Sequence, residues 1–318
     1  MMTSPQPTIR PATADDLSAA AAIYAANEAE SSTRYHPLLG EVFDYAESHR
    51  GALEDLQLAF DDDPRQVWIA EDPEIGAIGF AAAIFRAHHW HLTYLFVAKD
   101  ARQKGIGAAL LTAIHQAGRD AGCTSFSLQA SDDPRALTRY LSLGLKPRPS
   151  SINWHAREPR FPAPDPMSRL HVIPLSLEDE ALLNTIDDID KAVRGVRHRQ
   201  DLQRWLQKGE RGALVVERES DTPVGYFFVS VDKDAGRIGP VASLAESRFR
   251  EVLDIALRAA AELHRTGVTW SAISPGENHA AIDGFFDAGF RPGYCDIFLA
   301  SGPIGRWESY LLHDVDYL

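Results

Sequence analysis

Residues 102–107, with the sequence RQKGIG, could bind an anion through their backbone. The apolar stretch before them ends in Val97 and a helix-forming run follows, so we expect a strand, a glycine turn and a helix. The first N–H groups of a helix have no partner inside it, and the helix dipole places partial positive charge there. Gly105 and Gly107 have no Cβ, which lets a phosphate lie against the backbone, and Arg102 and Lys104 add positive charge. The segment predicts an anion site, although a bare glycine turn can also serve only to tighten a strand–helix junction.

Two common phosphate-binding patterns do not fit this turn. The dinucleotide pattern needs a third glycine, but Leu110 stands at that position. The nucleoside-triphosphate pattern needs Lys and Ser or Thr after the last glycine, but Ala108 and Ala109 follow.

A histidine cluster, HHWH at residues 88–91, precedes the turn. His89 and His91 share one face of an expected strand, and a neutral imidazole can accept a proton near pH 7. The cluster is also typical of a polar hairpin end without chemistry. A metal site is the less favoured interpretation, because no carboxylate or cysteine joins these histidines. We expect no metal.

Four acidic side chains lie at the end of the first expected helix or after it: Glu28, Glu30, Glu41 and Asp44. Together they could hold a cationic amine. Each one taken singly is more typical of a solvated loop.

Composition narrows the class of protein. The chain has 318 residues, 45% hydrophobic and 24% charged, which suits two globular domains. A net charge of −13 argues against a nucleic-acid partner. Cys123 and Cys295 form neither a disulfide framework nor a metal knuckle, so we expect a reducing, cytoplasmic setting. We expect neither a signal peptide nor a membrane span.

Hydrophobic periodicity predicts an alternating α/β chain that passes twice through the same order of elements. The first pass has expected strands at residues 9–16, 67–70, 78–85, 90–98 and 125–129, and helices at 17–30, 42–60, 105–121 and 135–143. Residues 31–40 are expected to be a polar turn. The second pass has strands at 170–174, 213–218, 224–231, 237–242, 268–273, 294–299 and 309–315, and helices at 178–193, 202–207, 249–264 and 280–288. A proline-dense stretch at 147–166 separates them, and residues 150–156 inside it are expected to form a strand of the first domain.

The repeat is also visible in individual residues. Tyr140-Leu141 and Gly144 correspond to Phe285-Phe286 and Gly289, a shift of 145 residues. Val97-Ala98 corresponds to Val241-Ala242, a shift of 144. We therefore expect a first domain at 1–157, a linker at 158–168 and a second domain at 169–318. The strand at 170–174 could serve either domain.

The pattern R-x-x-G-x-G after a valine-ended strand resembles the cofactor motif of the GNAT acyltransferase superfamily. The element order and the closing Y-x-x-x-G helix are similar as well. The resemblance covers nearly the whole chain as two copies, with the sharp motifs confined to residues 91–144. It implies a mixed α+β sheet, two tandem GNAT-like domains and binding of acetyl-CoA or another acyl-CoA.

The resemblance also implies roles for particular residues. The pyrophosphate would lie on the backbone N–H groups of residues 103–108, and a gap beside the preceding strand would hold the pantetheine arm. Tyr140 would protonate the leaving thiolate, and His91 occupies the position where some members carry a general base. Water or a carboxylate from residues 27–44 could serve as base instead. Asp133 stands where the family often has asparagine, which weakens a side-chain contact there. The implied cofactor-binding residues are Leu95, Phe96, Val97, Arg102, Gln103, Lys104, Gly105, Ile106, Gly107, Ala108 and Asp133.

The second copy departs from this motif. Carrying the alignment forward places Glu246, Phe249 and Glu251 where the first copy has Arg102, Gly105 and Gly107. Two carboxylates repel a pyrophosphate, and a phenylalanine blocks approach to the backbone. Asn278 occupies the position of Asp133. We expect one acyl-CoA site per chain.

These observations favour an N-acetyltransferase that transfers an acetyl group directly to the primary amine of a small molecule or peptide. A CoA-binding sensor without turnover is the alternative from another class. A third interpretation is an enzyme similar to mycothiol synthase, whose competent copy is the second, whereas here the first copy has the motif. The sequence is compatible with a monomer or a homodimer.

Overall fold

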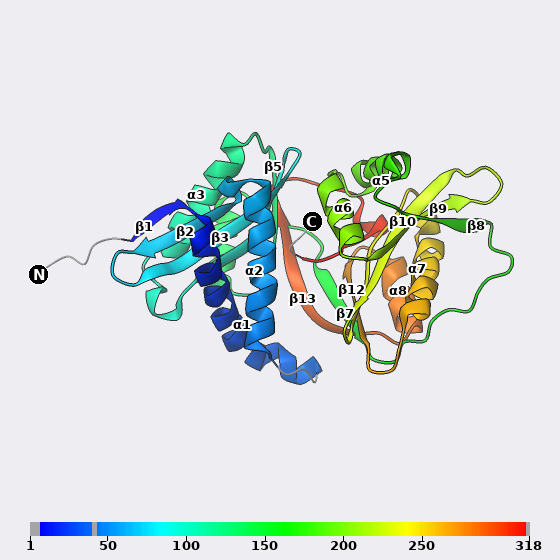
Figure 1. The fold of residues 1–318 in the computed structure, drawn as a ribbon, viewed down its shortest axis with the longest axis horizontal. Coiled ribbons are helices and arrows are strands. Elements are labelled where there is room, and N and C mark those ends of the chain that lie inside the picture. The colour runs from blue at the N-terminus through cyan, green and yellow to red at the C-terminus, as the bar shows by residue number, and fades with distance from the viewer. Residues whose placement is uncertain (1–6, 40–42, 316–318) are drawn as a thin grey trace, which may run out of the picture. The chain divides into compact units, whose positions relative to one another are not determined.

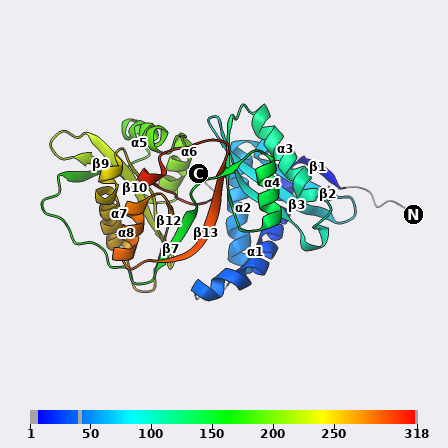
Figure 2. The same ribbon diagram turned by 180° about the vertical axis from the view of Figure 1, so that it is seen from behind.

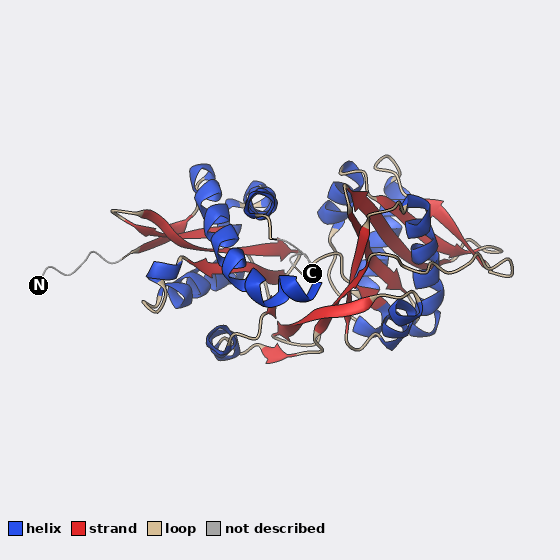
Figure 3. Ribbon diagram, turned by 90° about the horizontal axis from the view of Figure 1, so that it is seen from below, coloured by secondary structure: helices blue, strands red, loops and turns tan. Residues whose placement is uncertain are grey.

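The structure is a computed structural model that describes residues 7–39 and 43–315, with the side chains of residues 32–39 left aside. The chain divides into two compact units. The first consists of Met1–Gln129 and Pro134–Leu145, and the second of Ala130–Asp133 and Lys146–Leu318. In each unit taken by itself, helices cover strands of a mixed sheet (Figure 3). The predicted α/β class is confirmed.

The strands of the first unit lie in the order β1-β2-β3-β4-β5. Their bounds are β1 (Thr8–Pro11), β2 (Val67–Asp72), β3 (Gly76–Arg86), β4 (His89–Val97) and β5 (Ser125–Ala130). Neighbouring strands are antiparallel except for β4 and β5, which are parallel. A parallel pair needs a crossover connection, and helix α3 supplies it.

Helices cover both faces of this sheet. Their bounds are α1 (Leu17–Leu39), α2 (Tyr45–Asp62), α3 (Ile106–Asp120) and α4 (Pro134–Ser142), with short 3-10 turns η1 (Ala14–Asp16), η2 (Pro64–Gln66) and η3 (Lys99–Ala101). Helices α1 and α2 lie on one face (Figure 1), and α3 and α4 on the other (Figure 2). The apolar residues Leu110 and Ile114 of α3 are spaced four apart and fully buried, which fixes the face that α3 turns to the sheet.

A β-bulge in β4 switches the faces to which its side chains point. The register with β3 passes from Ala83↔Leu92 to Ala82↔Tyr94, so Thr93 is the extra residue. Before the bulge, Trp90 contacts Gly118 of α3. After it, the hydroxyl of Tyr94 donates to Asp55 of α2 at 2.9 Å.

The second unit has the strand order β13-β7-β12-β11-β10-β9-β8, with β14 paired to β11 and β6 paired to β13. Its strands are β6 (Lys146–Pro147), β7 (Ser151–Ala156), β8 (Leu170–Pro174), β9 (Arg211–Glu217), β10 (Pro223–Asp232), β11 (Ala235–Ser243), β12 (Thr269–Pro275), β13 (Arg291–Ala300) and β14 (Tyr310–Leu311). Its helices are α5 (Glu180–Val193), α6 (Arg199–Gln207), α7 (Phe249–Leu263) and α8 (His279–Asp287), with 3-10 turns η4 (Glu246–Arg248) and η5 (Trp307–Ser309).

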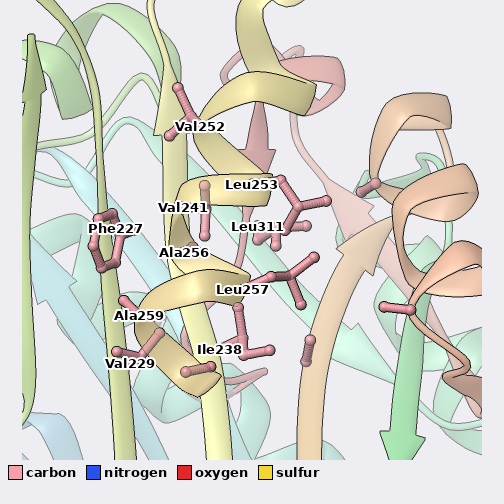
Figure 4. Packing of buried hydrophobic residues seen from close by; sticks show 14 of the residues in the cluster. Phe227, Val229, Ile238, Val241, Val252, Leu253, Ala256, Leu257, Ala259 and Leu311 are labelled. Carbon is pink, nitrogen blue, oxygen red and sulfur yellow. The ribbon is translucent and has the colours of Figure 1, made fainter. Parts of the chain in front are cut away.

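This sheet has a hydrophobic core on each face, because successive residues of β10 point to opposite sides. Phe227 joins the core under α7, together with Leu253 and Leu257 (Figure 4). Tyr226 and Phe228 join the other core, which α5 and α6 cover.

Several expected elements differ from those observed. Helix α1 continues to Leu39 through the stretch expected to be a polar turn, because polar composition alone does not end a helix. The helix expected from residue 42 begins at Tyr45, where Asp44 caps it by accepting from the N–H groups of Ala46 and Glu47, and residue 42 itself lies outside the described residues.

Strand β7 was expected in the first domain, but it pairs with β12 and β13 of the second unit. Strand β8 pairs with β9, which answers the open question of which unit it serves. The compact units therefore divide at Leu145, and the predicted repeat boundary at residue 157 stays a prediction about the two copies.

Candidate functional site

The glycine turn has an unusual backbone conformation. Gln103 has a φ of +67°, and Gly105 has φ +81° and ψ −4°, both in the left-handed region. A glycine takes this conformation without the steric cost that a Cβ imposes. Gly105 is the N-cap of α3, so the turn lies directly at the N-terminal end of this helix.

Five consecutive N–H groups of this turn have no acceptor within the described part of the chain: Gln103, Lys104, Gly105, Ile106 and Gly107. The N–H of Ala108 is already engaged, because it donates to the carbonyl of Gly105 at 3.1 Å. Of the N–H groups of residues 103–108 that were predicted to hold the pyrophosphate, that of Ala108 is therefore not available. Gln103, Lys104 and Gly105 are exposed, whereas Ile106 and Gly107 are buried. Buried N–H groups normally find a partner, so an unpaired run at a helix N-terminus is open to an anionic ligand.

The strand before the turn separates from its parallel neighbour. Pairing between β4 and β5 runs from His89↔Ser125 to Leu92↔Leu128, and the last five residues of β4 lie beyond it. Leu95, Phe96 and Val97 belong to this freed segment. Its edge therefore borders the gap in which the resemblance expects the pantetheine arm.

Arg102 is engaged within the protein. Its guanidinium donates to the carbonyl of Val97 at 3.2 Å, to the side-chain oxygen of Asn27 at 2.7 Å and to Glu30 at 2.7 Å. Lys99 pairs with the same carboxylate at 2.8 Å. Both cations lower the pKa of Glu30, and Lys99 has the larger effect. Arg102 thus joins α1 to the end of β4, and part of the charge that it was expected to offer an anion is balanced by Glu30, which it shares with Lys99.

A second arginine, which the sequence analysis did not single out, lies beside the turn. A Cβ built on Gly107 would be 3.8 Å from both Cζ and Nη1 of Arg139, and 3.6 Å from Cγ2 of Val97. No carboxylate of the described residues forms an ion pair with Arg139. Lys104, the other free cation expected here, is exposed. The signal in the sequence was a basic residue directly before Tyr140 in the predicted helix at residues 135–143.

The predicted acid and the helix-start residue lie on or next to α4. Tyr140 is the buried residue of this helix, with 8% of its surface exposed. Asp133 directly precedes the helix and is half-buried. The helix ends before Gly144, as expected.

The predicted base His91 is buried and belongs to a hydrogen-bonded chain across β4 and β5. His89 Nδ1 lies 3.0 Å from the hydroxyl of Ser125, and its Nε2 lies 2.7 Å from that of Ser127. The Ser127 hydroxyl also lies 2.9 Å from His91 Nδ1. This arrangement can pass a proton between the two imidazoles, since a hydroxyl both donates and accepts.

Of the four acids expected near the acceptor, two are committed elsewhere. Glu30 pairs with Lys99 and Arg102, and Asp44 caps α2. Glu28 is half-buried, and its Oε1 lies 3.4 Å from the hydroxyl of Ser31. Glu41 lies outside the described residues.

In the second copy, the residues corresponding to the turn form an ordinary helix start. Phe249 begins α7 fully buried in the core, and no residue from Glu246 to Glu251 has a left-handed backbone. The side chain of Arg248 donates to Glu251 at 3.0 Å and also to Glu217. Side chains of the protein itself therefore lie at the start of α7.

The C-terminal strand also closes the gap between the parallel strands of the second copy. Pairing of β11 with β12 ends at Ile238↔Ala272. Beyond that point, Val241 and Ala242 of β11 pair with β14, and Leu312 forms a bridge to Ile273 of β12. These two β11 residues correspond to Val97 and Ala98. In the second copy, β14 therefore pairs with the strand edge that corresponds to the freed end of β4.

Asn278 and Phe285 have structural partners in the second copy. Asn278 caps α8 through the N–H of Ala281 at 2.9 Å and donates to the carbonyl of Tyr310 at 3.2 Å. Phe285, which stands where the first copy has Tyr140, packs against Trp154.

Within residues 7–39 and 43–315, no cluster of three or more His, Cys, Asp or Glu side chains is arranged to hold a metal ion. None of the helices in these residues combines the length and apolarity that crossing a membrane requires.

Comparison with known proteins agrees with this geometry. Residues 28–145 match the model of the acetyltransferase (GNAT) family. No protein with a curated description matches the chain.

Solved structures similar to the chain include a provisionally assigned acetyltransferase from Pyrococcus horikoshii, at 15% identity and TM-score 0.71, covering 100% of this chain and 98% of that one. A GCN5-related N-acetyltransferase from Sphaerobacter thermophilus has 17% identity and TM-score 0.60, with 94% and 96% covered. A tandem GNAT protein from the clavulanic acid biosynthesis pathway has 16% identity and TM-score 0.56, with 94% and 99% covered. Sequence identities this low establish the fold of the chain and not its reaction or substrate. The chain thus has the tandem GNAT fold, and its residues 28–145 belong to the GNAT acetyltransferase family, whose general reaction is acyl transfer.

Proposed function

We propose that the chain is an N-acetyltransferase that moves an acetyl group from acetyl-CoA to a primary amine of a small molecule or peptide. The observation that carries this proposal is the run of free N–H groups from Gln103 to Gly107, next to a strand that has separated from β5. In this proposal the diphosphate of CoA lies on those N–H groups. The pantetheine arm lies along Leu95, Phe96 and Val97, and the second copy holds no CoA at the corresponding place.

The reaction proceeds in one ternary complex. The neutral amine attacks the thioester carbonyl carbon, a C–N bond forms, and the C–S bond breaks as the tetrahedral intermediate collapses. The hydroxyl of Tyr140 gives its proton to the departing thiolate, which leaves as free CoA thiol. The ordinary phenol pKa of ~10 suits this transfer.

The amine must lose a proton before or during its attack. His91 accepts that proton directly or through a water molecule, and Ser127 and His89 extend the path. Glu30 is a poorer base, because Lys99 and Arg102 lower its pKa.

The setting of the reaction is also part of the proposal. Cys123 and Cys295 are both free thiols, which suits a reducing cytoplasm. The proposal holds for a monomer or a homodimer.

Replacing Tyr140 by phenylalanine tests the enzyme. We expect Tyr140→Phe to bind acetyl-CoA as the wild type does and to release CoA thiol at least ~100-fold more slowly, because only the proton donor is lost. The measurement is thiol release against a panel of amines, with acetyl-CoA affinity determined by calorimetry. Tyr45→Phe, at an exposed tyrosine of α2, is the matched control.

The panel also separates the two classes of function. Acetyl-CoA binding without thiol release for any amine would favour a CoA sensor. Absence of acetyl-CoA binding would contradict both functions.

A further inference from the structure

We propose that Arg139 binds the diphosphate of the acyl donor, as the principal cationic ligand of the site. This inference rests on the proposed function. It assigns the ionic contact to α4, whereas the motif itself points to Arg102 and Lys104.

Arg139 lies beside the N-terminal turn of α3. Gly107 lies in the first turn of α3 with its N–H unengaged, and a Cβ built on it would be in van der Waals contact with Val97 and with the guanidinium of Arg139. An anion that accepts from the N–H groups of residues 105–107 therefore comes within reach of Arg139. A guanidinium can hold two phosphate oxygens at once, which a lone N–H cannot.

The charge of Arg139 differs in its surroundings from those of Arg102 and Lys104. Arg102 donates to Val97, Asn27 and Glu30, and it shares the Glu30 carboxylate with Lys99. Lys104 is exposed, so bulk water screens its charge. Arg139 is half-buried and forms no ion pair with a described residue, so its charge acts on the turn with less screening.

The second copy has no arginine at the position that corresponds to Arg139. A shift of 145 residues places Gly284 of α8 where α4 has Arg139. A Cβ on Gly284 would lie only 2.7 Å from Cδ2 of Leu253 in α7, so the two helices of that copy are packed too closely for a longer side chain. The copy that lacks the glycine turn thus also lacks the arginine and the space for it.

The arrangement links donor binding to chemistry. Arg139 and Tyr140 are neighbours on one helix. A diphosphate held by Arg139 therefore fixes the position of α4, which carries the proposed proton donor.

The test titrates three probes into the wild type and Arg139→Gln by calorimetry: CoA, ADP and pantetheine, which has no diphosphate. We expect Arg139→Gln to weaken CoA and ADP by ~10- to 100-fold and to leave pantetheine unchanged. The loss should shrink as salt is raised. Arg139→Lys should recover part of the affinity, since it keeps the charge and loses the paired donors.

Arg119→Gln is the matched control, since it removes the same charge from the exposed far end of α3 and should bind CoA as the wild type does. Equal CoA affinity of Arg139→Gln and the wild type would overturn the inference and leave the proposed function intact. Binding of ADP but not CoA by the wild type, with ADP lost in Arg139→Gln, would overturn the proposed function and support the anion site. A wild type that binds neither ADP nor CoA would overturn both.

Discussion

At the scale of single residues, the two arginines near the glycine turn, Arg102 and Arg139, have different partners. Arg102 joins α1 to the end of β4 through three acceptors, while Arg139 is free beside Gly107. Sequence reasoning selected Arg102 because it opens the motif. It missed Arg139, because the carboxylate that pairs with Arg102 lies 72 residues away in the chain and no local pattern reveals it.

The proton path of the proposed reaction also depends on residues that the sequence did not connect. His89 and His91 were expected on one face, but the hydroxyl that bridges them belongs to Ser127, 36 residues after His91. Parallel pairing of β4 with β5 brings it there, because His91 stands opposite Ser127.

A buried acid in the second unit makes stability depend on pH. Asp190 is fully buried on α5, with its carboxylate 2.7 Å from Nδ1 of His198 and the hydroxyl of Tyr226 donating to it. Burial raises the pKa of Asp190 from an ordinary 3.8 to about 8, against the opposing effect of Arg194. Between these two pH values, the folded state therefore keeps a proton on Asp190 that the unfolded state has lost. Its stabilising effect is complete below about pH 4 and disappears as pH rises toward 8.

We therefore predict that the free energy of unfolding falls from pH 5 to pH 8, with a slope of at most ~1.4 kcal/mol per pH unit from this group. Asp190→Asn keeps the shape and cannot ionise, so its loss over that range should be smaller. Denaturant unfolding at several pH values measures this. Asp188→Asn, at an exposed neighbour on the same helix, should follow the wild type. Equal pH dependence in the wild type and Asp190→Asn would contradict the assignment.

At the scale of elements, the helices and strands with the strongest local sequence patterns were predicted best. Helix α3, with its apolar residues on one face, begins and ends within a residue of its expected limits. The end of α1 was wrong, because a helix can continue through polar residues. Membership of β7 in the second sheet could not be predicted, because its partners β12 and β13 are more than 100 residues away.

Close packing of α3 on the sheet gives a test of the fold at Gly118. A Cβ there would lie 2.3 Å from Cδ1 of Trp90, a fully buried ring. We predict that Gly118→Ala lowers the free energy of unfolding by ~1–3 kcal/mol, since the ring or the helix must shift. Gly51→Ala in α2 meets no atom within 4 Å and should raise it by ~0.5–1 kcal/mol. Urea titration of both variants measures the difference, and stabilisation by Gly118→Ala would show that α3 packs otherwise.

At the scale of the whole chain, the two copies of the fold differ at the glycine turn and at the strand edge beside it. The first keeps free N–H groups and a freed strand edge. The second fills the corresponding edge with β14 and the corresponding turn with Phe249. Sequence alignment predicted the loss of the turn. It could not predict that the C-terminal strand takes the place of a ligand, because pairing between Val241 and Leu311 joins residues 70 apart.

The central claim is therefore one acyl-CoA site per chain, in the first copy, and the stoichiometry of CoA binding tests it most directly. Calorimetry should give one CoA per chain for the wild type. Gly107→Glu, which introduces the residue found at Glu251 of the second copy, should abolish binding, while Gly51→Glu at an open position of α2 should retain it. Two CoA molecules per chain, or full binding by Gly107→Glu, would contradict the account.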